Sequence, residues 1–303
     1  MLLRGRASRA DNRLKISLDL KMDQGLPIAK QPRAQTATFR ATDFAPSLAE
    51  VARRYQLLWH MTIRHLRGQY KQSMLGYAWA FLNPLSQMLI LSFVFSVLLR
   101  FDSGDVPFPL FVFVGLLPWI FFSTALASAT DSVTGAASLV TKVRFPREIL
   151  PIAAIFTKVV DLGFGLIILV ALMFYFGEAP TWTALWVPLL FLIHMLFVMG
   201  LSLPLAALNL FFHDVRYLVG VALNIWFYVT PIIYPVDAVP SKYHVIFDIN
   251  PNALLINAYR RVLLQDTGPG LDRLVIGLAI AVVTFVVGYY LFKRMEPNFA
   301  DRI

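Results

Sequence analysis

The sequence contains no cysteine and few charged residues. Without cysteine among its 303 residues, the chain can form neither a disulfide framework nor a thiolate metal site. Charged residues make up only 15% of the chain and hydrophobic residues 58%, and the mean hydropathy is +0.65. A water-soluble domain carries more charge and less apolar surface than this. The composition therefore predicts an all-α, polytopic membrane protein.

The chain also lacks the motifs of common enzyme and metal sites. It has no Gly-x-x-x-x-Gly-Lys-Ser/Thr loop for nucleotide phosphates and no Gly-x-Ser-x-Gly nucleophile motif. Its five histidines are dispersed, without metal-ligand spacing. We expect no enzyme activity, no metal and no cofactor in this chain. The net charge of +9 is interpreted as a membrane-topology signal rather than a nucleic-acid surface, because most basic residues lie beside apolar segments.

Six apolar segments predict six transmembrane helices, since one crossing needs about 20 apolar residues. The segments cover about residues 78–99, 108–129, 149–176, 182–212, 218–235 and 274–292. The fifth meets Thr230-Pro-Ile-Ile-Tyr-Pro235, where two prolines stop a regular helix. Asn250-Pro251 then offers a cap and a first residue for another helix. We expect residues 230–265 to form broken or re-entrant helices beside a pathway, between spans five and six.

The N-terminal part of the chain differs from the rest. Residues 1–46 are basic and lack an apolar run, which predicts a disordered cytoplasmic tail. A helix over 47–70 is expected to follow, because Ser47 and Glu50 have capping-box spacing. Its apolar and basic residues separate onto opposite faces, which is typical of a helix lying in the membrane interface. Residues 47–303 are expected to form one transmembrane domain.

The distribution of lysine and arginine predicts the orientation. With six spans both termini lie on one side, and twelve basic residues near the spans lie there, against five on the other side. Positive residues favour the cytoplasm, so both termini are expected to be cytoplasmic and the 236–273 segment external.

One predicted span contains two opposite charges. Lys158 and Asp161 are spaced i, i+3 within 149–176 and can pair on one helix face, pointing into protein or water. The pair is either structural or part of a proton relay. The second alternative would make the chain an ion- or proton-coupled transporter.

Several motifs occur in a fixed order along residues 48–303. They are Tyr70-Lys-Gln-Ser-x-Leu-Gly-x-x-Trp79 with Pro84, Gly115-Leu-Leu-Pro-Trp119, Leu139-Val-x-Lys-Val-x-Phe-Pro-Arg147 with Ile149-Leu-Pro151, Thr230-Pro-Ile-Ile-Tyr-Pro235, Asn250-Pro251 through Arg260, and Phe299-Ala-Asp301. In order, spacing and number of spans, the chain resembles the polysaccharide-export permeases among the type 2 ATP-binding-cassette (ABC-2) exporters. It departs from them at Ala136-Ala137, where many relatives have Asn, and at His213, where they often have Arg. Polar contacts at these positions are not carried over.

The resemblance implies a transport subunit in the inner membrane. Such a permease works as a homodimer with two copies of a separate nucleotide-binding ATPase subunit, which holds ATP and Mg, and exports a lipid-linked polysaccharide such as an O-antigen, capsule or teichoic-acid-like chain. An exporter of small amphiphiles or drugs is the alternative within transport, and a non-transporting scaffold is a third possibility.

The resemblance also implies roles for particular residues. The 131–148 connector would be the coupling helix that docks on the ATPase, through Lys142, Arg144, Phe145, Pro146, Arg147 and Glu148. The cytoplasmic mouth would be formed by Tyr70, Leu75, Gly76 and Trp79. The 231–265 segment would be the paired, re-entrant external gate helices. Channel and gate candidates are Trp119, Phe122, Trp226, Phe227, Tyr228, Pro231, Tyr234 and Pro235. The rings could stack on the C–H faces of sugars, although aromatic residues also gather at the interfaces of any membrane protein.

Overall fold

The computed structural model describes residues 44–71, 74–100, 106–143, 145–236 and 239–302. All regular structure within these ranges is helical, which confirms the predicted all-α class. Helices α2 to α12 belong to one compact unit. The predicted disordered tail lies outside the described residues, apart from its last three positions.

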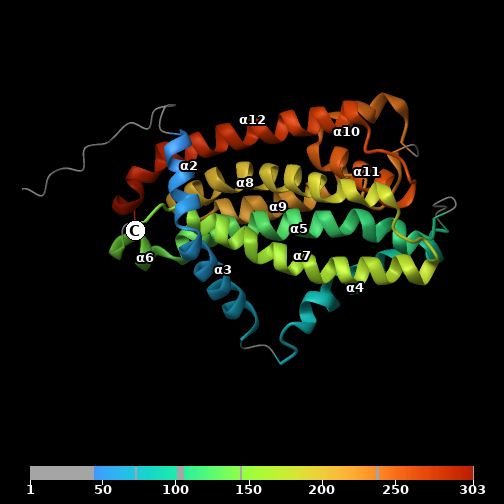
Figure 1. The fold of residues 1–303 in the computed structure, drawn as a ribbon, viewed down its shortest axis with the longest axis horizontal. Coiled ribbons are helices and arrows are strands. Elements are labelled where there is room, and N and C mark those ends of the chain that lie inside the picture. The colour runs from blue at the N-terminus through green and yellow to red at the C-terminus, as the bar shows by residue number, and fades with distance from the viewer. Residues whose placement is uncertain (1–43, 72–73, 101–105, 144, 237–238, 303) are drawn as a thin grey trace, which may run out of the picture. The chain divides into compact units, whose positions relative to one another are not determined.

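Five helical segments are long and apolar enough to cross a membrane. They are α4 (Ala78–Ser92) with its π-helical continuation η2 (Phe93–Leu98), α5 (Phe108–Gly135), α7 (Ile149–Phe176), the 3-10 turn η3 (Trp182–Trp186) with α8 (Val187–Phe211), and α12 (Leu271–Met295). They correspond to predicted spans one, two, three, four and six. Figure 1 shows α5, α7, α8 and α12 running lengthwise beside one another.

The fifth predicted span is shorter than expected. Helix α9 (Val215–Val229) has 15 residues, about 22 Å at 1.5 Å per residue, against roughly 30 Å of hydrocarbon. It ends six residues before Pro235 because Thr230 is already extended, with φ −93° and ψ 133°. A residue that precedes proline disfavours the helical region, and Pro231 follows directly. The six-span count is therefore not confirmed.

The helix before the first span and the connection between spans two and three also differ from the expected boundaries. The first helix begins at Phe44, so the start predicted from the Ser47 capping box is wrong. It is divided at Arg54 into α2 (Phe44–Arg53) and α3 (Tyr55–Tyr70). Helix α5 continues past the predicted end at 129, and the short α6 (Ala137–Lys142) follows it.

The segment after α9 forms two short helices, α10 (His244–Ile249), preceded by the 3-10 turn η5 (Ser241–Tyr243), and α11 (Pro251–Leu264). The side-chain oxygen of Asn250 accepts a hydrogen bond from the Asn252 N–H at 3.1 Å, and Pro251 is the first helical residue. This confirms the helix start predicted from Asn250-Pro251. In Figure 1, α10 and α11 lie at the end of the long helices opposite to α6.

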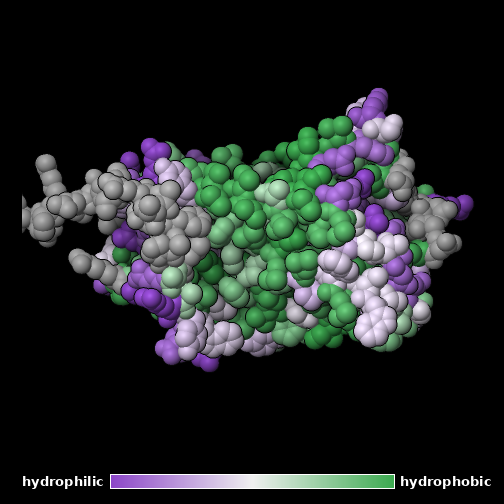
Figure 2. All heavy atoms as spheres, turned by 45° about the horizontal axis from the view of Figure 1, so that its top comes forward, coloured by the Kyte–Doolittle hydropathy of each residue, from purple (hydrophilic) through white to green (hydrophobic). Residues whose placement is uncertain are grey.

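The surface carries a wide hydrophobic band. Figure 2 shows hydrophobic residues across the middle of one face and hydrophilic residues toward both ends. Many large apolar side chains on this unit are exposed, among them Ile90, Ile167 and Val283. A soluble protein rarely exposes contiguous apolar surface of this extent. Together with the five long apolar helices, the band identifies a multi-pass membrane protein.

Helices α8 and α12 are held together by close backbone contact. A Cβ atom added to Gly288 of α12 would overlap the carbonyl oxygen of Gly200 of α8, and one added to Gly200 would lie 2.6 Å from the backbone nitrogen of Phe285. Small residues allow such an approach, which favours helix association within a membrane.

We predict that Gly288→Ala destabilises the protein by about 1–3 kcal/mol, because the added methyl group must push the two helices apart. Gly277→Ala is the matched control, since a Cβ atom at Gly277 of the same helix meets nothing within 4 Å. Unfolding of the purified variants in detergent measures the difference. Equal stability of the two variants would contradict the packing described here.

Candidate functional site

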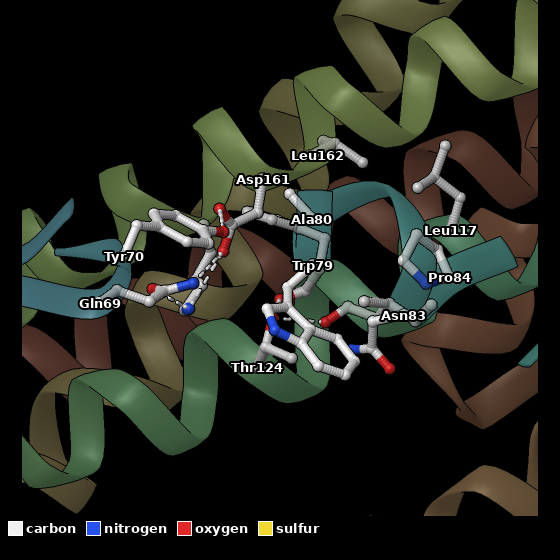
Figure 3. A pocket seen from close by; sticks show the side chains of 13 residues that line it. Gln69, Tyr70, Trp79, Ala80, Asn83, Pro84, Leu117, Thr124, Asp161 and Leu162 are labelled. Atoms are coloured by element: carbon white, nitrogen blue, oxygen red, sulfur yellow. Dashed lines mark hydrogen bonds and ion pairs between the residues drawn. The ribbon is translucent and has the colours of Figure 1, made fainter. Parts of the chain in front are cut away.

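A cavity of about 270 Å³ lies where α3, α4, α5 and α7 meet. It brings together two groups of residues that the sequence suggested separately. Tyr70 and Trp79 come from the predicted cytoplasmic mouth, and Lys158 and Asp161 are the predicted charge pair. Gln69, Asn83 and Thr124 complete its polar lining (Figure 3). This cavity is the candidate functional site.

The carboxylate of Asp161 is the centre of a closed hydrogen-bond network. Tyr70 Oη donates to Asp161 Oδ1 at 2.6 Å, and Gln69 Nε2 donates to Oδ2 at 3.2 Å. Lys158 Nζ donates to the same Oδ2 at 3.1 Å and to Gln69 Oε1 at 2.7 Å. Figure 3 shows the side chains of Tyr70 and Gln69 converging on Asp161. The network joins the end of α3 to the middle of α7.

The local structure explains this convergence. The i, i+3 spacing places Lys158 and Asp161 on one face of α7, and that face packs against the last turn of α3. The side chains of Lys158 and Asp161 are only 14% and 22% exposed, so their attraction is weakly screened. Burial and the hydrogen bond to Asp161 raise the pKa of Tyr70 above its usual value. Its hydroxyl therefore keeps its proton at neutral pH and acts as the donor.

A tight turn separates the network from α4. Gly76 has φ +49°, a conformation that favours glycine, and the Ala78 N–H donates to the Leu75 carbonyl at 2.9 Å. Leu75 is 50% exposed and Trp79 52% exposed. Trp79 lies beside Thr124 and Asn83 in Figure 3, so its ring borders the cavity.

The sequence did not reveal Gln69, Asn83 or Thr124 as site residues. Gln69 adjoins the Tyr70 motif, and Asn83 is a polar residue within an otherwise apolar span. Asn83 could have been identified from the sequence, because an amide within a predicted span has to face protein or water rather than lipid.

The end of the predicted coupling connector is anchored on the C-terminal part of the chain. Glu148 is fully buried, and Lys293 Nζ lies 2.8 Å from its carboxylate, while Tyr289 Oη donates to it at 3.1 Å. Arg147 Nη1 donates to the Glu296 carbonyl at 2.6 Å, and Glu296 begins the 3-10 segment η6 (Glu296–Asp301). In this conformation the Glu148 side chain is not accessible to a partner protein.

The remaining connector residues are not equivalent. Lys142 is exposed, Pro146 is buried and Phe145 is half-buried against two core clusters. Arg144 lies outside the described residues. Among the described coupling candidates, Lys142 is therefore the one whose side chain is most open to contact.

Most of the aromatic channel candidates pack against one another. Phe122 is fully buried, with its ring centroid 5.1 Å from that of Trp226, and Trp119 lies 5.6 Å from Phe227. Tyr228 is 72% exposed. The Tyr228 ring centroid lies 5.3 Å from that of Phe227, but most of the Tyr228 side chain is open to a ligand in this conformation, whereas Phe122 belongs to the core.

The backbone break after α9 is held by buried polar side chains. Arg260 Nη1 donates to the Pro231 carbonyl at 2.7 Å and Nη2 to the Ile232 carbonyl at 2.5 Å. The Arg260 guanidinium also lies 3.7 Å from the centre of the Phe111 ring. Asn250 accepts from Trp226 Nε1 at 2.9 Å and donates to Thr230 Oγ1 at 3.0 Å. The carbonyls freed by the prolines are thus satisfied within the protein, as membrane depth requires.

The chain is similar to known transport proteins. A family model described as "ABC-2 type transporter" matches residues 56–264. The O-antigen export system permease protein RfbA of Myxococcus xanthus is 33% identical over 82% of this chain and 95% of its own length. A protein of the same name from Klebsiella pneumoniae is 29% identical over 82% and 95%. The polysialic acid transport protein KpsM of Escherichia coli is 21% identical over 77% and 91%.

We predict that Tyr70→Phe lowers the free energy of unfolding by about 1.5–3 kcal/mol, the usual contribution of a hydrogen bond to a charged group. Hydrogen exchange should rise in the last turn of α3, because that turn loses its strongest bond to α7. Tyr77→Phe is the control, since no hydrogen bond of the Tyr77 hydroxyl is found among the described residues. If both variants exchanged like the unmodified protein, the Asp161 network would not fix α3.

Proposed function

Because this chain belongs to the ABC-2 type transporter family, we propose that it is the permease subunit of an ATP-driven exporter of lipid-linked polysaccharide. The observation that carries the proposal is the 33% identity to an O-antigen export permease over 95% of that relative. A second set of relatives, named for polysialic acid transport, supports a polysaccharide substrate. The five long apolar helices suit a transport component.

ATP hydrolysis is assigned to a separate partner subunit. The sequence lacks a nucleotide-binding Gly-rich loop, whereas the family works with an ABC ATPase. The exposed Lys142 would contact that subunit. Arg147 and Glu148 would pass the movement to α12, since they are bonded to Glu296 and Lys293.

The permease is proposed to act as a homodimer. Helix α9 buries Val219 and Leu223 against the core and leaves Leu218, Val221 and Ile225 about 60% exposed on its other face. The polar Asn224 is exposed beside them, and an amide at membrane depth is costly against lipid. A second copy of the chain covering α9 would give this amide a protein or water environment.

We place the chain in the inner membrane with both termini in the cytoplasm. The excess of basic residues on the side of the termini supports this orientation. The hydrogen bond between Arg147 and Glu296 supports it too, because the connector and the C-terminal segment must then share one side.

The candidate site is proposed as the cytoplasmic mouth for the glycan. The half-exposed ring of Trp79 offers a stacking face, and Asn83 and Thr124 offer hydrogen-bonding groups beside it. Lys158 and Asp161 act as a structural brace, since their polar atoms are occupied by Gln69 and Tyr70.

One observation favours export of small amphiphiles as a second candidate. A largely apolar cavity of about 360 Å³, lined by residues such as Leu166, Phe191 and Leu263, lies between α5, α7, α8 and α11. Its size suits a small ligand rather than a polymer.

Reconstitution tests the proposed function. In proteoliposomes that contain the permease and the ATPase encoded with it, we predict ATP-dependent movement of lipid-linked glycan and no movement with the permease alone. The same assay with small amphiphiles in place of the glycan tests the second candidate function. Glycan movement without an ATPase, or failure of the two subunits to co-purify, would contradict the proposal.

At the mouth, Gly76→Val should lower export several-fold while membrane insertion and ATPase binding stay unchanged. A β-branched residue at φ +49° costs more than about 1–2 kcal/mol of backbone strain, and the turn must change to relieve it. Gly268→Val is the control, because a Cβ atom there meets nothing within 4 Å and its φ is not left-handed. Export at the unmodified rate from Gly76→Val would leave the turn without a role in transport.

A further inference from the structure

A second polar cavity, of about 410 Å³, lies between α3, α5, α6 and α7 on the other side of Gln69 from the candidate site. Nothing in the proposed transport mechanism uses it. Its lining residues are Met61, Arg64, His65, Gly68, Gln69, Ser128, Gly135, Ala136, Leu139, Leu150 and Thr157.

One face of α3 forms a wall of this cavity. Met61, Arg64, His65 and Gly68 follow i, i+3, i+4, i+7 spacing, so they project from the same side of the helix. The wall is fixed in position because Gln69 and Tyr70, one turn further along, are bonded to Asp161 of α7.

The cavity is electropositive. Arg64 is exposed to it and has no hydrogen bond or ion pair within the part of the chain that the structure describes. The described lining contains no carboxylate. Burial, together with the charges of Arg64 and Lys158, lowers the pKa of His65. Because the described lining holds the Arg64 charge and no carboxylate to balance it, the cavity favours an anion.

The cavity also has room and neutral donors for that anion. The Ser128 hydroxyl has no bonded partner among the described residues, and it lies on the α5 side. Cβ atoms added to Gly68 or Gly135 would meet nothing within 4 Å, so both glycines border open space. The guanidinium of Arg64 can approach a phosphate with two parallel N–H groups.

The surroundings favour an anion that carries an apolar tail. Met61, Leu139 and Leu150 line the cavity beside its polar groups. On the same helix, Tyr55 and Trp59 are 64% and 60% exposed, as is common for rings at a membrane interface. A free inorganic ion would need only the polar part of this lining.

We propose that this cavity binds the phosphate group of a membrane lipid through Arg64 and Ser128. Two sources have the required chemistry, a bilayer phospholipid with an anionic headgroup and the diphosphate of a polyprenyl-linked glycan. Binding is measured apart from transport, so the site can fail while the proposed function stands, and the reverse.

The test uses the full-length chain in detergent micelles and native mass spectrometry to measure binding. The probes are phosphatidylglycerol, diacylglycerol with the same acyl chains, a polyprenyl diphosphate, and sodium pyrophosphate. Arg64→Gln removes the charge. Gly68→Leu places a side chain at the cavity wall, where an added Cβ atom meets nothing within 4 Å, and leucine has a better helix propensity than glycine. Arg67→Gln is the matched control, because Arg67 is an exposed arginine of α3 that does not line the cavity.

We expect a phosphate-bearing lipid to bind the unmodified chain and Arg67→Gln equally. Its affinity for Arg64→Gln and Gly68→Leu should be lower by about tenfold or more. Diacylglycerol should bind all four proteins weakly. Whichever of phosphatidylglycerol and the polyprenyl diphosphate binds more tightly in this Arg64-dependent way is the source. The proposal would be overturned if Arg64→Gln bound these lipids as well as the unmodified chain, or if neither phosphate-bearing lipid bound more tightly than diacylglycerol. Arg64-dependent binding of pyrophosphate alone would also overturn it.

Discussion

The Asp161 carboxylate determines how α3 is placed against α7. A carboxylate within an apolar helix must be paired, because leaving it unpaired in a low dielectric costs several kcal/mol. Asp161 obtains its partners from Lys158 on its own helix and from Gln69 and Tyr70 on α3. This requirement fixes the end of α3 against α7. The positions of the Gly76 turn, of Trp79 and of the electropositive wall of α3 follow from it.

The same constraint explains the other irregular parts of the chain. Where prolines break the helix after α9, Arg260 and Asn250 satisfy the exposed carbonyls and hydroxyl from a neighbouring helix. Where the connector re-enters the bundle, buried Glu148 is paired with Lys293 of α12. Both of these described junctions are therefore held by polar side chains from elsewhere in the chain. A movement at one of these junctions has to be transmitted to the helix that supplies the partner.

Features that depend on local sequence could be predicted. The apolar run of α7 gave both of its ends, 149 and 176, and Asn250-Pro251 gave the start of α11. The end of α9 at Val229 was missed, because the apolar residues continue past the point where Pro231 excludes a helix. Lys158 was expected as a partner of Asp161 from its spacing, but Tyr70 as a partner of Asp161 and Lys293 as a partner of Glu148 could not be predicted. They lie 91 and 145 residues away in the chain, and only tertiary packing brings them together.

We propose that ATP hydrolysis by a partner subunit drives export, while Lys158 and Asp161 serve as a brace and carry no protons. Both parts are tested by measuring glycan export in proteoliposomes that contain both subunits and ATP, before and after a protonophore collapses the proton gradient. We expect the same export rate in the two conditions. Export that stops with the protonophore, or that runs on a proton gradient without ATP, would contradict it.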